Sequence, residues 1–254
     1  RCLVHHNYIS DTGAFSESGG RNIGPGIRLD GYTNRSIISE NIIVDSLEHG
    51  IKEYEYGTYQ ENQIINNIII NPNCTGISAS GYHTLVAFNQ IYNVPSNHGI
   101  WATGHHQRII GNEVYNVTNS GSYGIVATNN TIVTNNIVTN SYDGIQVQNN
   151  CTVIGNLVYN VSYYSIHING NYTVASGNTV RSVVNSARGI RIQDAYFGIF
   201  VGNSLVDLYY GVEELTSDYN IITSCDTHEC SNGIIIVGAN TKVHLCWNIT
   251  SWIA

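Results

Sequence analysis

Short segments in which apolar and polar residues alternate recur along this chain. The segments 77–80, 145–148, 166–169 and 190–193 each begin with Ile and then alternate with a period of two. This pattern is typical of a β-strand that buries one face. Pairs of β-branched or aliphatic residues, as at 37–38, 109–110 and 153–154, predict further strands. No window holds the 3.6-residue apolar period of an amphipathic helix, so we predict an all-β protein.

Two sequence markers repeat with one period. The first is Gly followed by Ile or Val, with Ser replacing Gly once, at intervals of 20 to 26 residues: Gly26, Gly50, Gly76, Gly99, Gly124, Gly144, Ser165, Gly189, Gly211 and Gly233. The second is Asn two residues before an aliphatic residue, with Cys225 at the midpoint of the last interval: Asn7, Asn41, Asn67, Asn89, Asn112, Asn136, Asn156, Asn178, Asn203 and Asn248. A period kept by two markers predicts a solenoid. Leucine-rich repeats need regularly spaced Leu, which is scarce in this chain, and propeller blades need about 40 residues or more per repeat. The repeat therefore fits neither of these two classes.

The Gly-Ile pairs and the recurring Asn motifs resemble the right-handed parallel β-helix family over nearly the whole chain. The resemblance extends to the β-helices of polysaccharide lyases and of related carbohydrate-active or surface proteins. It implies a right-handed parallel β-helix solenoid of about ten coils with a period of about 23 residues, formed by residues 1–254 as a single domain. It also implies that the Asn side chains lie at the turns and bond to one another along the stack.

Composition narrows the range of partners. Charged residues make up 11% of the chain, against about a quarter in an average soluble protein. The formal net charge is −8 and there is no basic run, so we expect no nucleic-acid partner. No apolar stretch approaches the roughly 18 to 20 residues of a membrane span. Carbohydrate is the partner class that we expect.

A candidate groove is predicted on the first four coils. The interval from Asn7 to Gly26 is unusually long, and insertions in solenoids collect on the binding face. In each strand, the residues one and three positions after the Gly-Ile isoleucine should point outward. Charged, His and aromatic residues gather there in the first coils, whereas the middle coils have a bland, uncharged pattern. The predicted floor of the groove contains Arg28, Asp30, His49, Lys52, Tyr54, His98 and Trp101.

Three interpretations of this floor remain open. In a polysaccharide lyase, Lys52 would be the base, with Arg28 and His49 as further catalytic residues. Some β-helix lyases use a similar Lys/Arg pair, often with calcium, so the resemblance implies calcium as the only cofactor to consider. The carbohydrate-binding residues would then be Asp30, Tyr54, His98 and Trp101.

A glycoside hydrolase would instead need two carboxylates across the sugar. Asp30 with Glu48, Glu53 or Glu55 could form the pair, and Asp30, Glu53 and Glu55 are also the acidic residues available for calcium. The third interpretation is a surface ion-pair cluster without a catalytic role. The adjacent histidines 5–6 and 105–106 would point to opposite faces of a strand, so we expect no metal site from them.

The cysteines and glycosylation sequons favour an extracellular or cell-surface location. No Cys-x-x-Cys motif occurs, which disfavours a structural metal. Cys225, Cys230 and Cys246 fall within about one coil, so we expect one disulfide among them. Eight Asn-x-Ser/Thr sequons mark candidate glycosylation sites, at Asn34, Asn73, Asn116, Asn129, Asn150, Asn160, Asn171 and Asn248.

Two functional hypotheses follow. The chain starts and stops within a repeat, with no visible capping helix, so we expect it to contact copies of itself end to end or flanking segments of a longer chain. The favoured hypothesis is an extracellular glycosylated structural module that stacks into a fibre or surface appendage and binds carbohydrate. The alternative is a polysaccharide-active enzyme, a lyase before a hydrolase, with its groove on the N-terminal coils.

Overall fold

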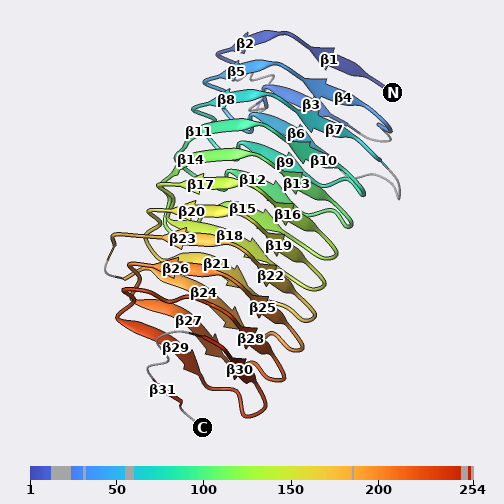
Figure 1. The fold of residues 1–254 in the computed structure, drawn as a ribbon. Helices are drawn as coiled ribbons and strands as arrows, with labels where there is room; N and C mark the ends of the chain where they lie inside the picture. Colours follow the sequence, from blue (N-terminus) through green and yellow to red (C-terminus); the bar gives the residue numbers. More distant parts are fainter. Residues whose placement is uncertain (13–23, 31–32, 55–59, 185, 247–250, 253–254) are drawn as a thin grey trace, which may run out of the picture.

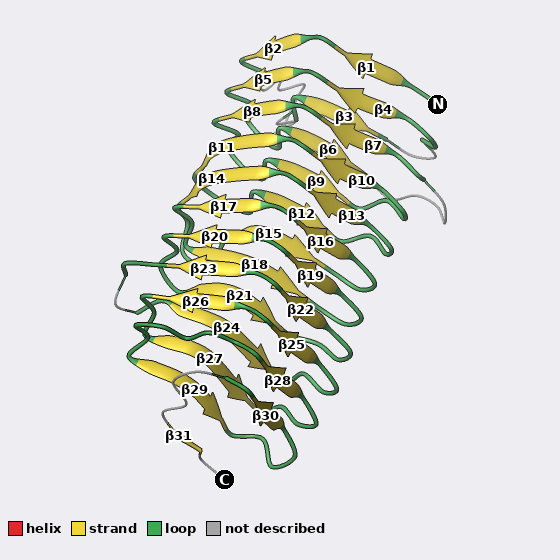
Figure 2. Cartoon of the chain, viewed as in Figure 1, coloured by secondary structure: helices red, strands yellow, loops and turns green. Residues whose placement is uncertain are grey.

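The described part of the chain winds into an elongated all-β rod. The computed structural model describes residues 1–12, 24–30, 33–54, 60–184, 186–246 and 251–252. These residues form 31 short strands and no helix, and β1 and β31 lie at opposite ends of the rod (Figures 1 and 2). Accordingly, none of the residues described here forms a helix that could cross a membrane. The prediction of an all-β solenoid is confirmed.

Most coils contribute one strand to each of three parallel sheets, and among the described residues sheet B ends two strands before the other two. Sheet A contains β1 (Leu3–His5), β4 (Ile37–Ser39), β7 (Gln63–Ile65), β10 (Leu85–Ala87), β13 (Arg108–Ile110), β16 (Ile132–Thr134), β19 (Thr152–Ile154), β22 (Val174–Ser176), β25 (Ile199–Val201), β28 (Ile221–Thr223) and β30 (Lys242–His244). Sheet B contains β2 (Tyr8–Ser10), β5 (Ile42–Val44), β8 (Ile68–Ile70), β11 (Gln90–Val94), β14 (Glu113–Val117), β17 (Ile137–Thr139), β20 (Leu157–Tyr159), β23 (Thr179–Arg181) and β26 (Ser204–Val206).

Sheet C follows the Gly-Ile markers. It contains β3 (Ile27–Leu29), β6 (Ile51–Glu53), β9 (Ile77–Ala79), β12 (Ile100–Ala102), β15 (Tyr123–Ala127), β18 (Asp143–Val147), β21 (Tyr164–Ile168), β24 (Arg188–Gln193), β27 (Tyr210–Leu215), β29 (Asn232–Ile236) and β31 (Ser251–Trp252). The isoleucines after the marker glycines pair with one another, as Ile27 does with Ile51 and Ile51 with Ile77. The repeat therefore reflects strand register.

Tight packing explains the recurrent glycine. A Cβ atom placed on Gly99 would lie 2.4 Å from Val114 Cγ1 and 2.5 Å from the Gly124 carbonyl oxygen. Real Cβ atoms do not approach other heavy atoms so closely, and protein cores have little room to adjust. The marker glycine thus lets sheet C and sheet B approach across the core.

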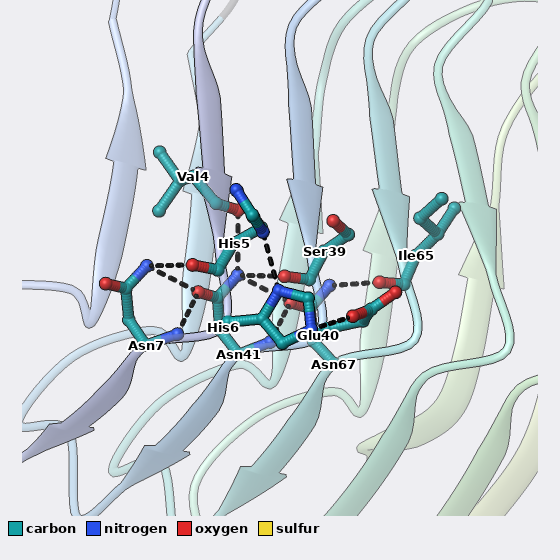
Figure 3. Close-up of polar contacts among 9 residues, drawn as sticks. All are labelled: Val4, His5, His6, Asn7, Ser39, Glu40, Asn41, Ile65 and Asn67. Atoms are coloured by element: carbon teal, nitrogen blue, oxygen red, sulfur yellow. Dashed lines mark hydrogen bonds and ion pairs between the residues drawn. The ribbon is translucent and has the colours of Figure 1, made fainter.

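An asparagine ladder closes the turn between sheets A and B. The Asn41 side-chain nitrogen donates to Asn67 Oδ1 at 2.9 Å and to the Val4 carbonyl at 3.0 Å, while Asn7 donates to Asn41 Oδ1 at 2.9 Å. Figure 3 shows these three asparagines in line along the stack. Equivalent bonds continue to Asn203, which confirms the predicted ladder. Because each amide is fully bonded, it can be buried at little cost.

The ladder column ends in cysteines. The Asn203 amide nitrogen lies 3.8 Å from Cys225 Sγ, and Cys225 contacts Cys246 on the next coil. Cys246 therefore occupies the position that a regular spacing assigned to Asn248, which lies outside the described residues. Because coil lengths vary, counting with a fixed period of about 23 residues passes Cys246, which is the residue that continues the ladder.

The expected disulfide is not formed in the structure. Cys225, Cys230 and Cys246 are all free thiols. Their sulfur atoms instead approach carbonyl oxygens of the preceding coil, for Cys230 that of Leu205 at 3.3 Å and for Cys246 that of Ile222 at 3.8 Å. Burial raises the pKa of Cys230 to about 11 and also raises that of Cys225, which keeps both thiols protonated at neutral pH.

The sequons differ in accessibility. Three of them are exposed: Asn34, Asn73 and Asn150. Four others are partly buried, and their side chains bond to neighbouring coils: Asn116, Asn129, Asn160 and Asn171. Glycosylation stays a prediction, and the exposed asparagines are the better acceptors.

Candidate active site

The first predicted residues do meet at the N-terminal end of sheet C. Arg28 Nε lies 2.6 Å from Asp30 Oδ1, and Lys52 Nζ forms an ion pair with Glu48. The Arg28 and Lys52 cations lie 4.4 and 4.6 Å from the centre of the Tyr54 ring. Register places Arg28 directly beside Lys52. Five of the seven predicted floor residues therefore form one cluster with Glu48.

This N-terminal cluster is poorly suited to base catalysis. Burial lowers the pKa of Lys52, but its hydrogen bonds to Glu48 and Tyr54 outweigh burial and leave the pKa above the usual value. A lysine that holds its proton so firmly cannot accept one from a substrate at neutral pH. Both cations are already paired, which matches the interpretation of the cluster as surface ion pairs.

His49 completes the cluster from below the surface. It is only 6% exposed, and its Nε2 lies 3.3 Å from Glu48 Oε1. Burial, together with the charge of Lys52, lowers the pKa of His49 to about 4. The imidazole is therefore neutral at pH 7 and covered by Lys52 and Glu48.

Glu53 cannot contribute to an outer carboxylate pair or calcium site. Its side chain is 1% exposed and points into the rod, where Asn62 Nδ2 donates to it at 2.7 Å and the Gly81 amide at 3.0 Å. The strand alternation accounts for this, because Glu53 follows the outward Lys52. Glu55 lies outside the described residues. In the part of the chain that the structure describes, no three His, Cys, Asp or Glu side chains converge as metal ligands.

A second group of polar and aromatic side chains covers sheet C from its middle coils, where the sequence predicted a bland surface, to the charged positions of later coils. It comes from β15, β18, β21, β24 and β27, and we call it the central cluster. Parallel register places seven of its eight members in two rows, and Tyr163 stands directly before β21. The central cluster consists of Tyr123, Asp143, Tyr163, Tyr164, His167, Arg188, Arg191 and Glu213.

A phenol–imidazole pair lies at its centre. The Tyr123 hydroxyl oxygen and His167 Nδ1 are 3.0 Å apart, and the two side chains are 9% and 7% exposed. Burial lowers the pKa of His167 to about 4, aided by the charge of Arg191, and burial raises the pKa of Tyr123. At neutral pH the pair is therefore an uncharged imidazole hydrogen-bonded to a protonated phenol.

Asp143 adds a carboxyl group that titrates near neutrality. The residue is 2% exposed, and its Oδ1 accepts a hydrogen bond from the Tyr164 amide at 2.7 Å. Burial raises the pKa of Asp143 to about 6, although that hydrogen bond opposes the shift. A carboxyl group with this pKa exchanges protons readily in the physiological range.

Two guanidinium groups border the pair. Arg188 Nε and Arg191 Nη1 lie 3.0 and 3.1 Å from the same oxygen of Glu213. The guanidinium of Arg191 also lies 4.7 Å from the centre of the Tyr164 ring, and that of Arg188 lies 4.4 Å from the Tyr163 ring. Two cations share one carboxylate, so the group keeps an excess positive charge at a surface of aromatic rings.

His98 and Trp101 adjoin the central cluster and not the N-terminal one. His98 Nδ1 accepts a hydrogen bond from the Tyr123 amide at 3.0 Å, and its ring centroid lies 5.8 Å from that of Trp101. Burial lowers the pKa of His98 to about 4. Trp101 is 37% exposed at the edge of the cluster. These two predicted carbohydrate-binding residues thus extend the central cluster toward the N-terminus.

The central cluster can move protons next to a bound anion. It holds a neutral imidazole, a phenol, a carboxyl group with a raised pKa and two cations within one face. Such a concentration of perturbed pKa values is typical of catalytic sites. The signal was present in the sequence, because Tyr123, Asp143 and Tyr164 stand directly before successive markers, but each repeat contains only a part of the group.

Comparisons with known proteins agree with the fold. A family model described as the right-handed beta helix region matches residues 98–248. No curated protein matches the sequence. Among solved structures, the A-module of a mannuronan C-5 epimerase from Azotobacter vinelandii is similar over 84% of this chain and 64% of its own, with a TM-score of 0.61 and 13% identity.

Two further solved structures are similar. The Dettilon tailspike protein matches over 96% of this chain and 60% of its own, with a TM-score of 0.61 and 14% identity. A periplasmic alginate epimerase matches over 86% of this chain and 50% of its own, with a TM-score of 0.50 and 18% identity. The chain spans less than two thirds of the length of each of these proteins. At sequence identities this low, the structural similarity shows a shared fold and nothing more.

Proposed function

This chain belongs to the right-handed β-helix family, and from that premise we propose that it acts on an acidic polysaccharide at the central cluster. The proposed reaction begins with removal of the proton on the sugar carbon that bears the carboxylate. Return of a proton to the opposite face gives epimerisation, whereas loss of the neighbouring glycosidic oxygen gives elimination. Both outcomes require a base, an acid and a cation near the carboxylate.

The observation that carries the proposal is the hydrogen bond between Tyr123 and His167, next to Arg191. The neutral imidazole accepts a proton, the phenol relays or donates one, and the guanidinium offsets the charge that develops on the carboxylate. Asp143, with a pKa near 6, is a second proton donor at the same face. Two of the solved structures with a similar fold are named as epimerases, one of mannuronan and one of alginate, and this is the support that the similar folds give.

The N-terminal cluster has a lesser role in this proposal. Lys52 is held protonated, so the base in the proposed reaction is His167 and not Lys52. Arg28, Asp30 and Tyr54 lie on the same face of the rod as the central cluster, as polar contacts for a long polymer. Polymeric substrates are met outside the cytoplasm, so an extracellular or cell-surface location is part of the proposal, as is glycosylation at the exposed sequons.

The proposal is tested by incubating the protein with mannuronan or polygalacturonate in deuterated water. Proton NMR then follows loss of the signal of the proton next to the carboxylate, and ultraviolet absorbance follows unsaturated ends. We expect exchange by the wild type and at least a hundredfold loss in His167→Gln. His228→Gln is the matched control, because that histidine is 67% exposed and lies outside the central cluster. Absence of exchange and of unsaturated ends with every uronate polymer would overturn the proposal.

The second candidate function is a structural module whose copies stack end to end. Its support is the uninterrupted parallel ladder of coils, which offers strand edges for a further coil. Sedimentation of the purified protein tests it: a concentration-dependent shift to long oligomers supports stacking, and a monomer at high concentration contradicts it.

A further inference from the structure

A hollow opens on a different face of the rod, over sheet A near the N-terminal end. Its volume is about 660 Å³, and it lies on the outer surface of β4, β7, β10, β13 and β16. Two parallel rows of residues line it. The strand row is Ile37, Gln63, Leu85, Arg108 and Ile132, which pair in register along the sheet.

The second row lines the preceding turn. It consists of Arg35, Glu61, His83, His106 and Asn130, which all have positive φ angles between 41° and 60°. The shared conformation repeats the turn from coil to coil and turns the side chains to one side. The rings of His83 and His106 consequently stack, with centroids 5.2 Å apart and planes 10° apart. The hollow thus has a wall of charged and polar side chains beside a partly apolar floor.

The charge of this hollow is opposite to that of the whole chain. Among the described residues, its lining has three arginines, Arg1, Arg35 and Arg108, and one carboxylate, Glu61, whereas the net charge of the chain is −8. Arg35 Nε pairs with Glu61 Oε2 at 2.8 Å. Among the residues described, Arg108 has no ion-pair partner and is exposed. An unpaired guanidinium in a concave surface is suited to a carboxylate or sulfate.

The floor discriminates between anions. Ile132 is 42% exposed and Leu85 is half-buried, so the ligand must cover apolar surface as well as supply charge. Saccharide rings have apolar and polar faces, unlike a small inorganic anion. The residues also recur at the coil spacing of about 4.8 Å, so equivalent contacts repeat along the rod, as a linear polymer with repeating units requires.

We propose that this hollow, which we call the sheet A groove, is a second binding site, for an anionic oligosaccharide. Arg108 binds a carboxylate or sulfate group of the sugar, Leu85 and Ile132 contact its apolar face, and His83 and His106 donate hydrogen bonds. The sheet A groove and the central cluster lie on different sheets, so the groove binds polymer without reacting with it. This inference goes beyond the proposed function and does not depend on it.

The test is an NMR titration that reports from the groove itself. The methyl groups of Leu85 and Ile132 are observed while a hexamer of galacturonate is added at low salt. We expect both methyl signals to shift in the wild type, and Arg108→Gln to weaken binding about tenfold or more through loss of a charged hydrogen bond. Glu61→Gln should tighten binding severalfold, because it removes a carboxylate from the lining and frees Arg35. Unshifted methyl signals, or an unchanged affinity in Arg108→Gln, overturn the proposal.

Matched controls separate the groove from other sites. Arg181→Gln removes an exposed arginine of sheet B and should bind as the wild type does. His167→Gln should also bind normally at these methyl groups, so failure of the proposed reaction and failure of the groove are distinguishable. The methyl-esterified hexamer should bind far more weakly, since it lacks charge, whereas a sulfated dextran fragment should retain binding. Equal binding of the neutral hexamer, or tighter binding of a thymidine hexanucleotide, contradicts a site for anionic sugar.

Discussion

The Tyr123 hydroxyl and His167 Nδ1 lie 3.0 Å apart although the residues are 44 positions apart in the chain. The pair skips a coil, because Gln146 occupies the register position between Val126 and His167. The long Tyr123 side chain therefore reaches past one coil to the imidazole, whose ring centroid lies 5.0 Å from that of Tyr164. A solenoid can build a buried polar pair on an outer face in this way, without a separate domain to cover it.

Acidification is expected to destabilise the protein between pH 6.5 and 4. Burial lowers the pKa values of His49, His98 and His167 to about 4 in the folded state. The unfolded chain binds more protons in this range, so the stabilising contribution is complete above pH 6.5 and is lost as pH falls toward 4. We expect a loss of about 2 kcal/mol per histidine, measured by urea unfolding at pH 7 and pH 4.5. His167→Gln should reduce the loss, and a stability independent of pH would contradict the assignment of buried, neutral histidines.

Asp143 should act in the opposite sense. Its folded pKa is raised to about 6, so the folded state binds more protons and the stabilising contribution is lost as pH rises from about 4 to 6. Asp143→Asn removes this penalty and keeps an oxygen for the Tyr164 amide. We expect a gain of about 2 kcal/mol at pH 7 that vanishes below pH 4. Asp45→Asn, at an exposed position, is the control; a destabilised Asp143→Asn protein at pH 7 would refute the buried-carboxyl account.

The buried asparagine ladder should be far more important for stability than the exposed outer ladder, in which Asn116 donates to Asn93 and Asn93 donates to Asn71. Asn112 donates to the Val86 carbonyl at 2.9 Å and to Asn136 Oδ1 at 3.0 Å, and its own Oδ1 accepts from Asn89 at 3.0 Å. Asn112→Ala leaves these buried partners unpaired, so we expect a loss of about 3 kcal/mol or more in chemical unfolding. Asn116→Ala, which removes one bond of an outer ladder, should cost less than about 1 kcal/mol. Equal costs for the two variants would show that burial does not set the difference.

The sequence predicted the coils and the ladder because nearly every repeat contains the Gly and the Asn that these features require. The marker Gly at 99 reflects a steric contact with the next coil, at Val114 and Gly124, and Asn112 marks a turn, so the period alone locates both. The last coils depart from this rule, since Cys225 and Cys246 continue the ladder where counting pointed to Asn248.

The central cluster was harder to predict because it depends on side-chain length and burial across coils. Strand alternation places His167 outward, one residue after Ile166, but its contact with Tyr123 cannot be read from spacing. The predicted role of Lys52 as a base likewise depended on a neighbouring side chain, Glu48, whose position the spacing does not reveal. Glu48 lies close enough to hold the lysine proton, and residue type alone does not reveal it.

The most direct test of the account is a double-mutant cycle on Tyr123→Phe and His167→Gln, with deuterium exchange on a uronate polymer as the readout. If the two side chains act as one proton-transfer unit, each single variant loses at least a hundredfold in rate and the double variant is no slower than the slower single one. Wild-type exchange that persists in all three variants would contradict a reaction at the central cluster.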